Sequence, residues 1–183
     1  MNIPNSLTLL RIALIPCFAA LSYIDPPWGP LLAAAVFALA AFTDWLDGYL
    51  ARRLGQMSRL GAFLDPVADK LMVAVVLIIL LQQHPSIWLA LPAAVIIGRE
   101  IAISALREWM AELGARQRVA VSIVGKVKTT VQMMALVLLV LRGPLFGLPL
   151  FELGMLLLYV ATILTLWSMT LYLQAAWPEL SRD

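Results

Sequence analysis

Charged residues, cysteine and histidine are all scarce in this 183-residue chain. Charged residues make up 13% of the sequence and hydrophobic residues 62%, whereas a soluble domain has about 25% and about 45–50%. Such a chain has too few polar residues for a soluble surface and is too hydrophobic to be disordered. One cysteine and one histidine exclude a disulfide framework and a multi-histidine zinc site. The composition therefore indicates an integral membrane protein, and a net charge of +2 argues against a nucleic-acid partner.

Six apolar segments approach the length of about 20 residues that a membrane-spanning helix needs. Clusters that contain proline or glycine separate several of them, at residues 25–30, 83–85 and 143–149. We expect spans at residues 7–24, 30–50, 65–82, 86–106, 119–141 and 153–173. The sequence thus predicts an all-α membrane protein with six transmembrane helices in a single domain, residues 1–183. Residues 1–10 are expected to lie along the membrane interface before the first span.

The distribution of arginine predicts the orientation in the membrane. The connections after the second and fourth spans carry Arg52, Arg53, Arg59, Arg107, Arg116 and Arg118, whereas the opposite connections carry only Arg142. Basic residues favour the cytoplasmic side. Because the number of spans is even, both termini are then cytoplasmic as well.

Four of the eleven acidic residues fall in one short window, at Asp44, Asp47, Asp65 and Asp69. Ionisable groups within membrane spans are costly and are functional candidates for that reason. Each pair is three or four residues apart, so its two members share one face of a helix. The second span ends and the third begins on the cytoplasmic side. We therefore expect all four carboxylates at a similar depth.

Clustered carboxylates repel one another unless some are protonated or cations hold them together. Oxygen-only ligands suit Mg²⁺, Mn²⁺ or Ca²⁺. Gly48 and Ala51 leave the same helix face without bulk, so a phosphate or nucleotide can approach it. The alternative is that the aspartates are helix caps and interfacial charges. Asp65, directly before a proline, fits a cap, but Asp44 and Asp47 lie at a helix end where the dipole disfavours anions.

The residues from Asp44 to Asp69 also match a family signature. They read D-x-x-D-G-x-x-A-R, eight residues, then G-x-x-x-D-x-x-x-D. This pattern resembles the signature of the CDP-alcohol phosphotransferases at all eight specified positions. Residues 5–11, 98–114 and 125–132 further resemble bacterial members that use glycerol 3-phosphate as the acceptor. Inositol phosphate, serine or phosphatidylglycerol are alternative acceptors, and a divalent-cation transporter is an alternative outside the family.

The resemblance implies transfer of a phosphatidyl group from CDP-diacylglycerol to glycerol 3-phosphate, with release of CMP. It implies a two-metal site that holds Mg²⁺ or Mn²⁺, formed by Asp44, Asp47, Asp65 and Asp69, with Asp69 also the general base. It places the nucleotide at Asp44, Gly48, Ala51, Arg52 and Gly61. It further implies a homodimer in the lipid bilayer of the bacterial inner (cytoplasmic) membrane, with the active site facing the cytoplasm.

An anionic acceptor needs cations, and three lie near the cytoplasmic ends of the fourth and fifth spans. They are Arg107, Lys126 and Lys128, and we expect them around the acceptor phosphate. The alternative is that these long side chains extend to the lipid headgroups. On an ideal helix Lys128 points about 200° away from Lys126. Both can share one pocket only if that pocket surrounds the helix.

Three further ionisable residues have no single interpretation from the sequence. Arg11, near the start of the first span, can cap the site from that helix. Arg99 and Glu100 lie deeper in the fourth span and point about 100° apart. They can form a salt-bridge network inside the bundle or contact substrate, and both interpretations stay open here.

Overall fold

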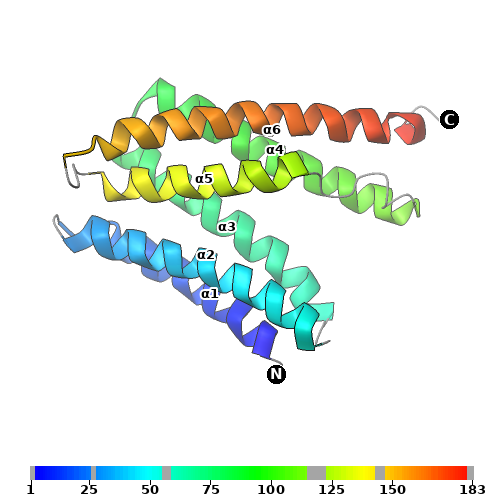
Figure 1. The fold of residues 1–183 in the computed structure, drawn as a ribbon, viewed down its shortest axis with the longest axis horizontal. Helices are drawn as coiled ribbons and strands as arrows, with labels where there is room; N and C mark the ends of the chain where they lie inside the picture. Colours follow the sequence, from blue (N-terminus) through cyan, green and yellow to red (C-terminus); the bar gives the residue numbers. More distant parts are fainter. Residues whose placement is uncertain (1–2, 26–27, 55–58, 115–122, 143–146, 181–183) are drawn as a thin grey trace.

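The computed structural model describes residues 3–25, 28–54, 59–114, 123–142 and 147–180, and every element in these ranges is a helix or a connection between helices (Figure 1). The six helices are α1 (Ile3–Leu21), α2 (Trp28–Leu54), α3 (Arg59–Gln83), α4 (Ile87–Glu112), α5 (Ile123–Leu141) and α6 (Leu150–Leu180). The prediction of six helices is therefore confirmed in the described part of the chain. Ser86 caps α4, because its side chain accepts a hydrogen bond from the backbone N–H of Trp88.

The helices are arranged in two groups that α3 joins. In Figure 1, α1 and α2 lie together on one side, α4, α5 and α6 lie on the other, and α3 crosses between them. Phe18, Phe37, Leu77 and Leu139 are buried where the groups meet. Successive helices reverse direction. In Figure 1 the start of α1, the end of α2 and the start of α3 lie toward the bottom of the view, and α6 ends at its right.

The structure does not separate residues 3–10 from the first span, and their expected position at the membrane interface stays a prediction. From Ile3 onward this segment belongs to α1. Pro4 lies in the first turn of α1. Backbone N–H groups there have no hydrogen-bond partner within the helix, so proline, which lacks this group, is tolerated. No helix breaker follows until Pro16. The continuous helix brings the residues of its first turns into the bundle.

The start of α3 also differs from the expected one. The helix begins at Arg59, so Asp65 lies inside the helix and does not cap it. Pro66 is then an interior proline, which removes one backbone hydrogen bond. Contacts of this turn with α1 compensate, because Thr8 donates a hydrogen bond of 2.5 Å to Asp65. A tertiary contact thus overrides the local preference, and capping does not explain Asp65.

The apolar surface fits a lipid environment. Among the described residues, three helical segments are long and apolar enough to cross a membrane: Trp28–Leu50, Ile87–Glu112 and Leu150–Pro178. Shorter apolar runs occupy Asn5–Leu21 and Val127–Leu141. Large side chains such as Phe42, Ile78 and Ile163 point outward. A soluble monomer rarely exposes so much apolar surface, so these features support a membrane protein.

Helices α5 and α6 approach each other closely at Gly154. A Cβ atom at this position would lie 2.9 Å from the Cγ atom of Leu139. At Gly98, on α4, an added Cβ would meet nothing within 4 Å. Only the absence of a side chain at Gly154 therefore allows this helix packing.

We expect Gly154→Ala to be less stable than Gly98→Ala by about 1–3 kcal/mol of unfolding free energy, the usual cost of overpacking. Both variants gain the same helix propensity, so their difference isolates the steric effect. Thermal unfolding of both proteins in the same detergent measures it. Equal stability of the two variants would contradict the close packing of α5 and α6.

Candidate active site

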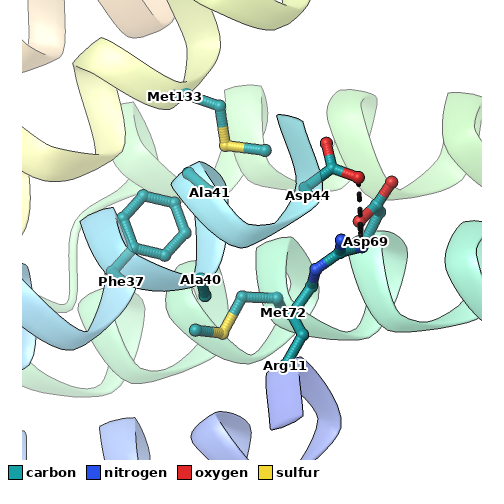
Figure 2. A pocket seen from close by; sticks show the side chains of 8 residues that line it. All are labelled: Arg11, Phe37, Ala40, Ala41, Asp44, Asp69, Met72 and Met133. Atoms are coloured by element: carbon teal, nitrogen blue, oxygen red, sulfur yellow. Dashed lines mark hydrogen bonds and ion pairs between the residues drawn. The ribbon is translucent and has the colours of Figure 1, made fainter. Parts of the chain in front are cut away.

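Arg11 joins three of the four aspartates at the centre of the site. Its guanidinium forms ion pairs with Asp47 and Asp69, and a third with Asp44 at 3.1 Å. Figure 2 shows the side chain rising from α1 toward the carboxylates of Asp44 and Asp69. The Arg11 side chain is only 2% exposed. The structure thus places a fixed positive charge among the aspartates from α2 and α3.

The fourth aspartate is also held by α1. Thr8 lies one turn before Arg11 and hydrogen-bonds Asp65. Asn5, Thr8 and Arg11 recur every three residues and are all buried, so they form a polar face on an otherwise apolar helix. Every signature aspartate therefore has a partner on α1. Thr8 lies outside the set that the sequence pattern predicts, although this spacing is the signal that points to it.

A cavity of about 320 Å³ opens beside the aspartates. This volume lies at the lower end of the range for small-molecule sites. The cavity is lined by Asp44, Asp65, Pro66, Asp69, Lys70, Val73, Glu100, Arg107, Lys128, Thr129, Gln132 and Met133. The structure therefore brings three predicted metal ligands and two predicted acceptor-binding cations to one space. Asp47 does not line this cavity, because it is buried behind Arg11.

Lys128 is engaged by a carboxylate and is not a free cation. Its ammonium lies 2.5 Å from Glu100 Oε1, which Arg99 also contacts at 3.2 Å. Arg99 donates a further hydrogen bond of 2.8 Å to Ser168 and lies over the ring of Tyr172. Arg99 and Glu100 thus form a salt-bridge network that links α4, α5 and α6. Because Lys128 is already paired with Glu100, this geometry argues against Lys128 as a direct phosphate ligand, and that role stays a prediction.

Lys70 and Arg107 are cations of the cavity wall that form no ion pair among the described residues. Arg107 is one of the residues expected to bind the acceptor, whereas Lys70 lies outside that set. Its position next to Asp69, on the helix that begins at the connection predicted to be cytoplasmic, is the sequence signal for it. Within the described part of the chain, these two side chains are therefore available to an anion that enters the cavity.

The residues expected to bind the nucleotide are described only in part. Gly48 lies on α2 and is half-buried, and Gly61 lies on α3 and is buried. The side chains of Ala51 and Arg52 lie outside the described residues, as does the side chain of Lys126 on α5. The backbone still places Gly48 one residue after Asp47, on the stretch of α2 that carries the aspartates.

Comparison with known proteins identifies the family. The family model described as CDP-alcohol phosphatidyltransferase matches residues 1–167. The chain belongs to this family. A Pseudomonas fluorescens protein named CDP-diacylglycerol–glycerol-3-phosphate 3-phosphatidyltransferase is 58% identical, covering 100% of this chain and 94% of its own. Proteins of the same name from Pectobacterium atrosepticum (57% identical, covering 96% and 94%) and Shigella flexneri serotype 5b (54%, covering 98% and 97%) are similarly related.

Members of this family use a divalent metal ion, and the type of the donor atoms here fits one, although their present arrangement does not. Carboxylate oxygens are the ligands that hard divalent ions prefer, and three of the carboxylates converge on a single positive charge. In the described part of the chain, no three acidic, histidine or cysteine side chains are arranged to hold an ion. Instead, the Arg11 guanidinium lies among the carboxylates of Asp44, Asp47 and Asp69.

We expect Glu100→Gln to destabilise the protein by about 3 kcal/mol, because it leaves Lys128 and Arg99 buried without their counter-charge. The double variant Glu100→Gln/Lys128→Met should recover part of this loss. Thermal unfolding in detergent measures both effects.

Glu152→Gln, an exposed position at the start of α6, is the matched control and should stay within about 0.5 kcal/mol of the parent. A Glu100→Gln protein as stable as this control would show that the network contributes nothing.

Proposed function

We propose that this chain transfers the phosphatidyl group of CDP-diacylglycerol to glycerol 3-phosphate, yielding phosphatidylglycerophosphate and CMP. It is then a phosphatidylglycerophosphate synthase, as the names of its relatives suggest. The observation that carries the proposal is the shared cavity, which has signature aspartates on one wall and cations on another. An anionic acceptor can bind the cations while its hydroxyl faces the aspartates.

In this proposal Asp44, Asp47, Asp65 and Asp69 would hold two metal ions, Mg²⁺ or Mn²⁺. Bound metal would neutralise the charge of the pyrophosphate and of the leaving CMP. The nucleotide approaches the face of α2 that carries Gly48, Ala51 and Arg52, with Gly61 of α3 beside it.

Asp69 takes the role of general base. Its side chain is 39% exposed and lines the cavity, so it can meet the acceptor hydroxyl. The hydroxyl oxygen attacks the phosphatidyl phosphorus and forms the new P–O bond, and the bond from phosphorus to the CMP oxygen breaks. The proton of the hydroxyl moves to Asp69.

The acceptor phosphate binds Arg107 and Lys70, with Lys126 as the third cation. Arginine can grip a phosphate through two nitrogens, whereas lysine supplies a point charge. Lys128 keeps its bond to Glu100 and contributes to the wall. Serine and phosphatidylglycerol offer no phosphate monoester for these cations, and inositol phosphate is a bulkier acceptor.

The membrane arrangement is also a proposal. All six helices cross the inner (cytoplasmic) membrane of a bacterium in one domain of residues 1–183, with both termini and the site on the cytoplasmic side. The chain acts as a homodimer. A cytoplasmic site receives glycerol 3-phosphate and the CDP headgroup from water while the acyl chains stay in the bilayer. Membership of a phosphatidyltransferase family favours this enzyme over a cation transporter.

The first test uses purified protein in CDP-diacylglycerol vesicles with a panel of acceptors. CMP release should require glycerol 3-phosphate, and Asp69→Asn should reduce turnover at least about a hundredfold through loss of the base. Asp25→Asn, an exposed position between α1 and α2 at the other end of the bundle, is the control and should retain turnover. Release with another acceptor alone, or normal turnover of a folded Asp69→Asn protein, would contradict the proposal.

The second test separates the acceptor from the nucleotide. Arg107→Ala should raise the KM for glycerol 3-phosphate about ten- to a hundredfold, the effect of one charge-assisted hydrogen bond. The KM for CDP-diacylglycerol should change much less. Steady-state CMP release with each substrate varied in turn measures both, with the exposed Arg53→Ala as control. An unchanged KM for glycerol 3-phosphate would remove Arg107 from the acceptor site.

A further inference from the structure

Arg11 is already the counterion of the acidic cluster in this structure. It pairs with carboxylates from two helices, and its side chain is almost fully buried. On the inner side it is closed off by Phe37, Met72 and Met133, which leave a space of only about 10 Å³ (Figure 2). The low polarity of these neighbours strengthens the attraction between the guanidinium and the carboxylates.

Arg11 occupies one oxygen of each of three carboxylates, and a divalent cation bound by the same carboxylates would compete with it for their negative charge. The two positive charges would repel each other at contact distance in so buried a place. The carboxylates should therefore bind the ion less tightly while all three remain paired with Arg11. The ion and the guanidinium are alternatives for the same ligands.

The arrangement has an open side and a closed side. Asp44 and Asp69 are 43% and 39% exposed and line the cavity, whereas Asp47 is 4% exposed and lies behind the guanidinium. A cation that enters from the cavity meets the two exposed carboxylates first. Arg11 Nε is buried without a hydrogen-bond partner among the described residues. One donor of the guanidinium is thus unsatisfied, which makes its displacement less costly.

We propose that Arg11 is a built-in counterion that keeps the aspartates together when no divalent ion is bound and competes with the ion for them. Without Arg11, metal binding should become tighter and the metal-free protein less stable. A residue that merely supports a metal site acts the other way, because its loss weakens binding. This proposal rests on the proposed function in one respect only, which is that the competing ion is a divalent cation such as Mg²⁺ or Mn²⁺.

The test titrates the full-length protein in detergent with Mn²⁺ alone and follows free Mn²⁺ by electron paramagnetic resonance. Arg11→Met should bind Mn²⁺ about a hundredfold more tightly than the parent, since several charge-assisted contacts no longer compete. Arg11→Lys, a point charge that satisfies fewer carboxylates, should bind about tenfold more tightly.

The second readout is stability with and without metal. In EDTA, Arg11→Met should melt about 6–20 °C below the parent, because the carboxylates lose their counterion, and excess Mn²⁺ should restore most of this loss. Arg99→Met is the matched control, since it also removes a buried, paired arginine. It should be destabilised equally in EDTA and in Mn²⁺, with unchanged Mn²⁺ affinity.

Unchanged or weaker Mn²⁺ binding by Arg11→Met would overturn the proposal. If Arg11→Met folds only when Mn²⁺ is present, this outcome supports the proposal, because the ion then replaces the missing positive charge. If it folds in neither condition, Arg11→Lys decides, and affinity no tighter than that of the parent would overturn the proposal. Substrate is absent throughout, so a failure of the proposed activity appears only in the CMP assay and is distinguishable from a failure here.

Discussion

The attraction between Arg11 and the aspartates of α2 and α3 is the constraint on which the rest of the structure depends. Four carboxylates cannot be gathered inside an apolar bundle without positive charge or hydrogen-bond donors beside them. Helix α1 supplies both, through the Arg11 guanidinium and the Thr8 hydroxyl. This requirement explains why a polar face runs along an otherwise apolar helix and why that face is turned inward.

A second set of charges shapes the opposite wall of the cavity. Arg99, Glu100 and Lys128 link α4 to α5 and, through Ser168, to α6. The chain of contacts fixes Lys128 against the wall and leaves Lys70 and Arg107 for an anion. The helices thus contribute different chemistry: α1 to α3 hold the acidic cluster and add Lys70, whereas α4 and α5 add Arg107 and Lys128 to the cavity.

The sequence predicts the acidic cluster well because its information is local. The spacing of Asp44, Asp47, Asp65 and Asp69 fixes helix faces, and apolar segments with their breaks fix the number of helices. The start of α3 and the role of residues 3–10 could not be read in this way. Both involve the packing of α1 against α3, where Thr8 hydrogen-bonds Asp65. These residues are far apart in sequence, and no periodicity reports such a pair. The bond between Glu100 and Lys128 escaped prediction for the same reason.

The most direct test of this account is an experimental structure of the protein with Mn²⁺ bound, with the ion located by its anomalous scattering. The account predicts the ion among the signature aspartates and Arg11 withdrawn from hydrogen-bond distance of those that bind it. An ion held by the aspartates while Arg11 keeps its contacts with Asp44, Asp47 and Asp69 would contradict it.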